Sequence, residues 1–444
     1  MAKYNILLQM DALKKHQIIL IFLLFAAAFF TYFPAMTAGF ASLDDAALLA
    51  GTNKTYNLTA SNIFAVFKTD YIGLYHPLVT LSFAVERYFF GMVPAFFHFD
   101  NMLLHILNTI LVFLIFARLT KSFAATYIIS FLFAVHPVHV EVVAWISARK
   151  DTLYSAFYLL SFLFYIKTYD GKNKKLLTAV SALFFLFACL SKAMAVTLPF
   201  VLILTDYFTG NFSKKNFKKY TAYFLITAIF IAVGIWSHYR NETDSPFAFV
   251  TLMQNILNAH FHVLFYIYKF LIPVKLYCMY PLFYDPATTP PWYIFVSPLI
   301  VYSMILFAFL SLKKTKKLFF GFLFFIIVLM PSSGILPIGI AAVADRYAYL
   351  AYIGLFYIFA EAVVLLYGYS NAVLKKVLMF LAIVAAGFLI YLSFNRSLDW
   401  QKETFAPPGG QPQYLKKSSA AVSQSAESTK FDEINKQAQN TQQK

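Results

Sequence analysis

Long apolar segments recur along this chain and limit its fold more than any other feature. Residues 18–33, IILIFLLFAAAFFTYF, contain no charged side chain, and several other segments approach the roughly 20 residues that a helix needs to cross a bilayer. Only 13% of the 444 residues are charged, whereas soluble domains carry about 25%. Backbone groups in lipid must be satisfied within the chain, so these segments predict membrane-spanning helices.

Basic residues separate the apolar segments and indicate the topology. The net charge is +16, and Lys and Arg are enriched in the cytoplasmic loops of membrane proteins. We therefore predict no nucleic-acid partner and place the basic clusters in the cytoplasm. The clusters are Lys14 and Lys15; Arg118 and Lys121; Lys172, Lys174 and Lys175; Lys214, Lys215, Lys218 and Lys219; Lys313, Lys314, Lys316 and Lys317; and Lys375 and Lys376.

Each interval between neighbouring clusters then crosses the membrane out and back. This predicts an all-α polytopic membrane protein of about 11 helices, within a range of about 11 to 13, with the N-terminus inside and the C-terminus outside. Residues 1–17 are the cytoplasmic N-terminus, 18–395 the membrane domain, and 396–444 a polar, mostly disordered external tail. The expected helices are 18–38, 97–117, 122–138, 152–168, 176–191, 197–209, 220–237, 293–311, 318–331, 350–369 and 377–394.

Two outer regions depart from simple crossings. Residues 40–96 form the first outer loop, and their apolar and aromatic content predicts amphipathic helices that lie on the membrane surface. Residues 238–291 form a second outer region. Within it, segment 250–272 is apolar but contains several polar residues, so charge asymmetry favours an interfacial or re-entrant segment, with two crossings as the alternative.

The stretch HPVHVEVVAWISARKD, residues 136–151, gathers ionisable residues at the outer end of an apolar segment. Pro137 is expected to break the preceding helix. His136, His139 and Glu141 form an H-x-x-H-x-E pattern, which lacks the i, i+4 histidine pair of zinc-binding helices. We therefore expect hydrogen bonding by the two histidines, with a bound divalent metal as the alternative.

Several other functional classes have no signature in the sequence. The two cysteines, Cys189 and Cys278, form no thiol-metal motif or disulfide framework. The sequence contains no glycine-rich phosphate loop and no G-x-S-x-G segment. These absences argue against an ATP-driven pump and an α/β-hydrolase.

Seven short segments point to a known family. They are LDDAALLAGTN, YHPLVTLSFAVERYFFG, FAVHPVHVEVVAWISARKDTL, SKAMAVTLPFVLILTDY, FLIPVKLYCMYP, ADRYAYLAYIGLF and NRSLDWQKETF, in this order. Together they resemble the membrane portion of the tetratricopeptide-containing transmembrane O-mannosyltransferases and their prokaryotic relatives, in the GT-C glycosyltransferase superfamily. After NRSLDWQKETF we expect a polar tail in place of the helical repeats of this family, and His76 stands where relatives often carry Arg.

The resemblance implies a polyprenyl-phosphate-linked sugar donor, an active site on the outer face, and a catalytic carboxylate in the first outer loop. It assigns Asp44 as the general base and Asp45 as a helper or metal ligand. Glu141 is predicted to hold the sugar or the acceptor, with an interfacial charge as the alternative. Cations stabilise a phosphate leaving group, and the candidates are Arg346, Arg149, Lys150 and Lys192. Substrate positioning is predicted for His76, His136, His139 and Asp345; an Asp345–Arg346 ion pair is the alternative at that position.

The resulting prediction is an integral-membrane glycosyltransferase in a prokaryotic plasma membrane. It would move mannose or another hexose from a polyprenyl-phosphate donor to a hydroxyl of a protein, glycan or lipid, with no required cofactor. Membrane lipids, the donor and the acceptor are the expected partners. A transporter or flippase of lipid-linked sugars is one alternative, although such proteins typically place charges near the membrane midplane and contain internal repeats. A non-catalytic scaffold of the same fold is the other.

Overall fold

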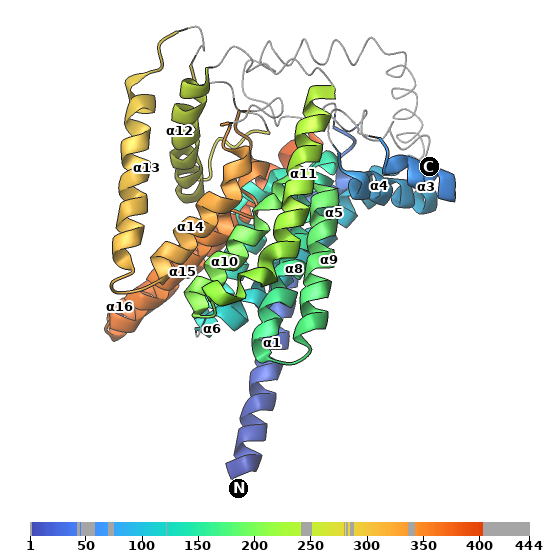
Figure 1. The fold of residues 1–444 in the computed structure, drawn as a ribbon. Coiled ribbons are helices and arrows are strands. Elements are labelled where there is room, and N and C mark those ends of the chain that lie inside the picture. Colours follow the sequence, from blue (N-terminus) through green and yellow to red (C-terminus); the bar gives the residue numbers. More distant parts are fainter. Residues whose placement is uncertain are drawn as a thin grey trace.

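A computed structural model describes residues 2–41, 45, 58–69, 75–120, 122–240, 251–278, 280, 283–284, 288–335 and 342–402. Within these ranges all regular structure is helical, and the helices pack into one bundle from which α1 extends at the N-terminus (Figure 1). The helices are α1 (Ala2–Tyr32), α3 (Ala60–Val66), α4 (Pro77–Phe90), α5 (Pro94–Leu119), α6 (Phe123–Val135), α7 (Val140–Ala144), α8 (Arg149–Lys167), α9 (Lys174–Ser191), α10 (Leu198–Thr209), α11 (Thr221–Arg240), α12 (Leu252–Leu271), α13 (Trp292–Ser311), α14 (Lys317–Leu329), α15 (Tyr352–Tyr369) and α16 (Ala372–Gln401).

Seven helical segments in the described part of the chain are long and apolar enough to cross a membrane, which confirms an all-α integral membrane protein. They are Gln17–Thr37, Pro94–Leu119, Lys174–Ser191, Lys214–Ser237, Trp292–Ser311, Tyr352–Tyr369 and Ala372–Gln401. The bent pair Phe123–Val135 and Pro137–Ala144, with an angle of 48°, is an eighth candidate. All 11 predicted segments are helical, but length and composition do not establish that each one crosses.

Helix α8 covers one of the predicted spans but is not among the seven apolar segments named above. It packs against both α5 and α9 in the interior of the bundle, and most of its side chains are buried. Its polar residues find protein partners there: the Ser161 hydroxyl donates to the Ser181 carbonyl of α9 at 2.7 Å. A helix that is shielded from lipid by its neighbours can carry polar side chains once they are hydrogen-bonded.

The predicted break at Pro137 is present in the structure. Helix α6 ends at Val135, His136 is extended with ψ 133°, and a short 3-10 segment, Pro137–His139, leads into α7. Proline cannot donate to the helical hydrogen-bond ladder and disfavours helical geometry in the residue before it. The break turns residues 140–151 across the end of the bundle.

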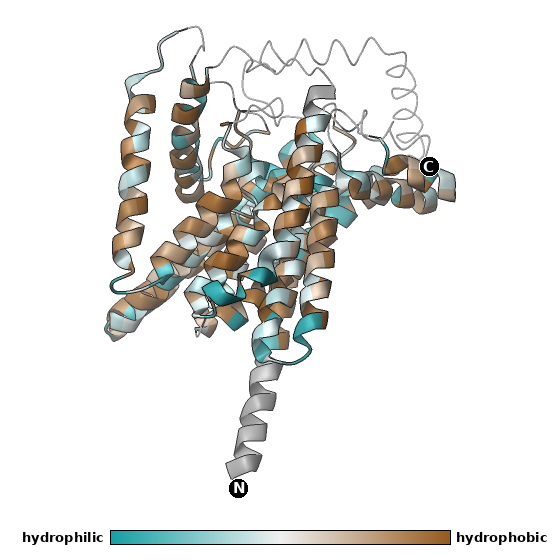
Figure 2. Cartoon of the chain, in the orientation of Figure 1, coloured by the Kyte–Doolittle hydropathy of each residue, from teal (hydrophilic) through white to brown (hydrophobic). Residues whose placement is uncertain are grey.

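Members of three predicted cytoplasmic clusters, Arg118, Lys219 and Lys316, lie at one end of the bundle, which we call the lysine-rich end. Arg118 in the last turn of α5 pairs with Asp170 after α8 at 2.9 Å, and Lys316 donates to the Tyr207 carbonyl of α10 at 2.8 Å. Figure 2 shows the hydrophilic turn between α8 and α9 at this end. Buried Asp206 anchors it further, because the carboxylate accepts from Tyr165 at 2.6 Å and pairs with Lys219 at 2.5 Å.

Helix α12, within the ambiguous segment 250–272, enters the bundle and does not reach the lysine-rich end. The Phe270 ring at its end packs against Phe356 and Phe359 of α15. Further along the chain, the Tyr280 hydroxyl donates to Asp345 at 2.7 Å. The interfacial or re-entrant character of segment 250–272 stays a prediction.

Two peripheral segments complete the fold. Helices α3 and α4 of the first outer loop project from the side of the bundle (Figure 1), and α4 exposes Tyr88, Phe89 and Phe90. Exposed aromatic rings of this kind suit the membrane interface. Helix α16 continues to Gln401, past the expected boundary at 395, and its Gln401 amide donates to the Pro34 carbonyl at 2.7 Å.

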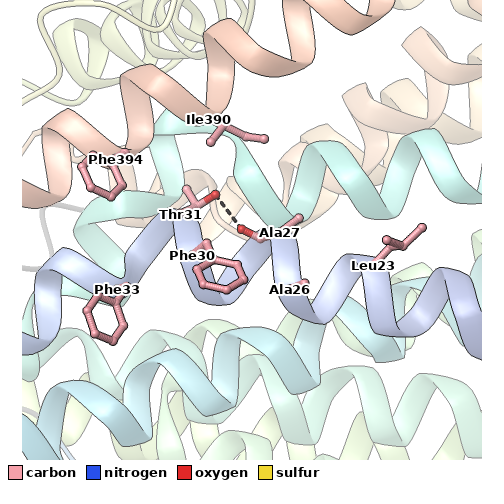
Figure 3. Close-up of a pocket in the computed structure, with 8 residues that line it drawn as sticks. All are labelled: Leu23, Ala26, Ala27, Phe30, Thr31, Phe33, Ile390 and Phe394. Carbon is pink, nitrogen blue, oxygen red and sulfur yellow. Dashed lines mark hydrogen bonds between the residues drawn. The ribbon is translucent and has the colours of Figure 1, made fainter.

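A cavity of about 500 Å³ lies between α1 and α16 (Figure 3). Its lining is Leu23, Ala26, Ala27, Phe30, Thr31, Phe33, Ile390 and Phe394. The only hydroxyl, that of Thr31, donates to the Ala27 carbonyl of its own helix at 2.6 Å. The cavity therefore offers apolar surface and no ionisable group.

Candidate functional site

Buried charges gather at the end of the bundle opposite the lysine-rich end. We call this the site end; it carries residues 136–151, Lys192 and residues 345–346. Glu141 and Asp151 are 0% exposed, and Arg149 is 1% exposed. Burying a charge is costly unless it is paired and hydrogen-bonded. Each of these charges is stabilised by the contacts described below.

Asp45 binds the middle of the charged stretch. Its carboxylate accepts from the backbone amide of Ser147 at 3.0 Å, from the Ser147 hydroxyl, and from the Ala41 amide at 2.8 Å. Both oxygens are thus engaged within the protein, and Asp45 ties the first outer loop to the 3-10 segment Ile146–Ala148. Asp44, the predicted base, lies outside the described residues.

Arg149 at the start of α8 is bound from three sides. Its guanidinium donates to Glu86 of α4 at 3.2 Å, to the Phe97 carbonyl at 2.8 Å and to the Asn101 side chain. The Asn101 amide in turn donates to the Trp145 carbonyl at 2.8 Å. Burial raises the pKa of Glu86 to about 7, while Arg149 opposes that rise. Arg149 therefore joins helix α4 to the site, and its donors bind groups within the protein.

Glu141 and Arg346 form a buried ion pair. The Arg346 guanidinium donates to Glu141 Oε1 at 2.5 Å, and the Arg346 backbone amide donates to Oε2 at 3.0 Å. The same guanidinium donates to the Cys278 carbonyl at 2.9 Å. The sequence predicts that Glu141 holds the sugar or the acceptor, whereas in the structure its carboxylate binds Arg346, the residue predicted to contact the phosphate.

Asp345 pairs with Arg396 of α16 at 3.0 Å, in place of the Asp345–Arg346 pair considered from the sequence. Tyr280 also donates to Asp345. Burial raises the pKa of Asp345, and the Arg396 charge opposes that rise. Sequence reasoning missed three residues at this end: Glu86, Asn101 and Arg396. Two of them are charges inside quoted family segments, and that signal could have identified them.

Lys192 follows α9 and binds Asp151 of α8 at 2.6 Å. Burial lowers the pKa of Lys192, and the nearby charges of Lys150 and Arg346 lower it further, while Asp151 acts in the opposite direction. The Lys150 ammonium lies 5.5 Å from the Trp145 ring centre, over which Arg346 also lies at 5.2 Å. Three cations from α8, α9 and the segment before α15 thus converge on one region.

The histidines of the charged stretch bind backbone groups. The His136 Nε2 atom lies 3.2 Å from the Phe270 carbonyl, and His139 Nδ1 lies 2.8 Å from the Phe133 carbonyl. These contacts support the broken helix and the end of α12. Glu141 is engaged with Arg346 instead of the imidazoles, and in the described residues no three His, Cys, Asp or Glu side chains converge as a metal site would require.

Several buried polar atoms at the site end have no hydrogen-bond partner in the described part of the protein. They are both ring nitrogens of His76, Nε1 of Trp145 and Oδ2 of Asp151. Native proteins leave few such atoms unsatisfied, so a cluster of them marks a place for a polar ligand or water. His76 precedes the first turn of α4 and is 4% exposed. The structure thus brings His76 to the same end as the predicted cations.

Comparisons with known proteins agree with this architecture, although no family model matches the chain. Protein O-mannosyl-transferase Tmtc1 of Drosophila melanogaster is 36% identical over 126 residues, which are 27% of this chain and 15% of that protein. A protein O-mannosyl-transferase of Caenorhabditis elegans is 22% identical over 347 residues, which are 74% of this chain and 47% of that protein. The chain thus spans less than half the length of these curated relatives.

The fold is similar to that of a solved oligosaccharyltransferase at low sequence identity. The apo oligosaccharyltransferase of Archaeoglobus fulgidus has a TM-score of 0.50 and 11% identity, covering 94% of this chain and 59% of that one. ArnT of Cupriavidus metallidurans, solved with undecaprenyl phosphate, has a TM-score of 0.44 and 11% identity, covering 84% and 64%. The chain is thus similar in sequence to part of two protein O-mannosyl-transferases, and similar in fold to an oligosaccharyltransferase.

Proposed function

We propose that this protein is a membrane glycosyltransferase that moves a hexose from a polyprenyl-phosphate donor to a hydroxyl acceptor at the site end. The observation that carries this proposal is the convergence of Lys150, Lys192 and Arg346 beside paired, buried carboxylates. Like charges repel strongly in a low-dielectric site. An arrangement that holds three of them together suits an anionic substrate group.

The donor phosphate supplies such an anion. Transfer of the sugar leaves the phosphate with growing negative charge, which nearby cations stabilise without rearranging. Asp151 orients Lys192, and Glu141 orients Arg346 through two hydrogen bonds. We assign the phosphate contacts to Lys150, Lys192 and Arg346. Arg149 is assigned a positioning role, because its donors bind Glu86, Asn101 and the Phe97 carbonyl.

The acceptor hydroxyl must lose a proton as it attacks. The family resemblance assigns this step to Asp44, and a positioned carboxylate base typically contributes ~10²–10⁴-fold in rate. Asp45 supports the step as a positioning residue, since it binds Ser147 and Ala41 at the edge of the site. Asp345, His136 and His139 hold the surrounding segments in place through the contacts already described. No step in this scheme needs a metal ion.

Mannose and a protein hydroxyl are our proposed sugar and acceptor. The two relatives in the sequence comparison are both named protein O-mannosyl-transferases. A serine or threonine side chain would supply the attacking hydroxyl. The site end is then the outer face of the membrane, as the positions of the basic clusters predict.

A transfer assay with purified protein tests the proposal. Radiolabelled undecaprenyl-phosphate mannose and a panel of other undecaprenyl-phosphate hexoses would be incubated with serine- and threonine-containing peptides. We expect transfer, and Lys192→Met should weaken donor use about tenfold to a hundredfold, the size of one charge-assisted hydrogen bond. Lys316→Met is the matched control, because it removes a lysine at the opposite end and should leave turnover unchanged.

Two results would contradict the proposal. One is the absence of both transfer and hydrolysis with every donor of the panel. The other is movement of the intact lipid-linked sugar across a vesicle membrane without transfer, which would support the flippase alternative. Equal loss of activity in Lys192→Met and Lys316→Met would remove the assignment of the phosphate site to this end.

A further inference from the structure

His76 is a buried histidine whose ring has no hydrogen-bond partner in the described part of the protein. It is 4% exposed, and both Nδ1 and Nε2 are unpaired. Its side chain does not cap α4, although it occupies the position before the first helical residue, Pro77. A buried imidazole normally satisfies at least one nitrogen. An unsatisfied ring at the site end is therefore available to a ligand.

The charges that act on His76 come from two neighbouring helices. Lys150 of α8 and Lys192 at the end of α9 both disfavour its protonated form, and together with burial they lower the pKa of His76 to about 3. The nearby carboxylates have other partners: Glu86 of α4 itself and Asp100 of α5 lie against Arg149, and Asp151 of α8 binds Lys192. Helix α3 contains no ionisable residue. In the ligand-free protein the ring is neutral and lies within reach of two of the proposed phosphate contacts.

The first turn of α4 adds further affinity for an anion. Helix N-termini carry partial positive charge and unsatisfied amides, and α4 is 14 residues long. Thr80, in that first turn, has a buried hydroxyl without a hydrogen-bond partner among the described residues. The helix terminus, the free imidazole and the two lysines are independent features that favour the same kind of ligand, an oxyanion.

We propose that His76 binds the donor phosphate together with Lys150 and Lys192, and that it takes up one proton as the phosphate binds. This inference rests on the proposed function and makes donor binding dependent on pH. The phosphate negative charge offsets the repulsion from the two lysines, so the imidazolium becomes favourable only in the complex. The proton comes from solvent and stays on the ring, where it strengthens the hydrogen bond to a phosphate oxygen. No covalent bond changes in this step.

The sign of the pH effect follows from linkage. A group whose protonation is favoured in the complex and disfavoured in the free protein makes binding tighter as pH falls. Between pH 8 and pH 6 the dissociation constant of the donor should decrease by about tenfold, as for a group half protonated near pH 7 in the complex; uptake of one full proton over that interval would give about a hundredfold. A phosphodiester such as undecaprenyl-phosphate mannose keeps one negative charge over this range, so its own titration does not contribute.

Binding of undecaprenyl-phosphate mannose to the purified full-length protein, measured at pH 6 and pH 8, tests the inference. We expect tighter binding at pH 6 for the wild type. His76→Gln should bind about tenfold more weakly at pH 6 and lose the pH dependence. His76→Arg carries a permanent charge and should bind equally well at both pH values. His262→Gln is the matched control, because it removes a buried imidazole of α12 that contacts Ser333 and should retain the pH dependence.

The outcomes separate this inference from the proposed function. Wild-type binding with an unchanged pH dependence in His76→Gln overturns the inference and leaves the function standing. A wild type that binds no undecaprenyl-phosphate mannose at either pH overturns both. Loss of the pH dependence in His262→Gln would assign the proton to another group. Inorganic phosphate is the remaining comparison: if it binds as tightly as the lipid, the site serves a free anion, which contradicts a lipid-linked ligand.

Discussion

Breaking the Glu141–Arg346 pair should destabilise the protein more than any single surface change. Both side chains are buried, with exposed fractions of 0% for Glu141 and 7% for Arg346. Glu141→Ala leaves the guanidinium without its carboxylate, and removal of one partner of a buried pair typically costs about 3–5 kcal/mol. It also removes the acceptor of the Arg346 backbone amide. Glu141→Gln preserves the shape and should cost less.

The structure supplies a control in the same chain. Arg118 and Asp170 also form an ion pair, at 2.9 Å, but their side chains are 40% and 57% exposed. Exposed pairs contribute about 0–1 kcal/mol because water and salt screen them. Asp170→Ala should therefore change stability little. The contrast between the two alanine variants isolates burial as the cause.

Equilibrium unfolding in detergent, followed by tryptophan fluorescence, measures the effect. Trp145 and Trp400 lie 6.1 Å apart at the site end and report on its loss. The double variant Glu141→Leu with Arg346→Met should lose less free energy of unfolding than the two single variants lose together, because an apolar pair replaces two charges. The assignment of a buried, coupled pair would be refuted if each single variant lost less than about 1 kcal/mol of unfolding free energy, or if the loss in the double variant equalled the sum of the two single losses.

Three further predictions concern other parts of the molecule. Burial raises the pKa of Glu86 to about 7, so its contribution to stability should be complete below its unfolded value near 4.5 and disappear as pH rises through 7; a wild-type melting temperature that shows no such pH dependence relative to Glu86→Gln would contradict this. Gly354→Ala should cost about 1–3 kcal/mol because the added carbon would lie 2.3 Å from the Gly321 carbonyl oxygen, whereas Gly368→Ala has open space and should be neutral in the same unfolding assay. Reporter domains fused after Lys317 and Lys402 should lie on opposite sides of the membrane, and the same location for both would overturn the predicted topology.

Local sequence patterns predicted the helices and the place of the charged site. Apolar length and the positions of basic clusters predicted segments that are all helical in the structure, and Pro137 predicted the break after α6. These features depend on residues within one or two turns of each other, because helix formation, helix termination and insertion into lipid are decided by nearby residues. The ionisable residues of 136–151 likewise lie together at one end of the bundle, and their role in a site stays a prediction.

Only the tertiary structure decided which charges meet. Glu141 binds Arg346, which is 205 positions away in the chain, and Arg149 binds Glu86 at a separation of 63. Arg346 directly follows Asp345 in the sequence. In the folded protein, however, Asp345 pairs with Arg396 of α16 and accepts a hydrogen bond from Tyr280, which lies after α12. A sequence reports that a charge lies near a membrane boundary. Its partner depends on how helices that are distant in the chain pack against each other, and that packing is set by side-chain shape and by the cost of leaving a buried charge unpaired.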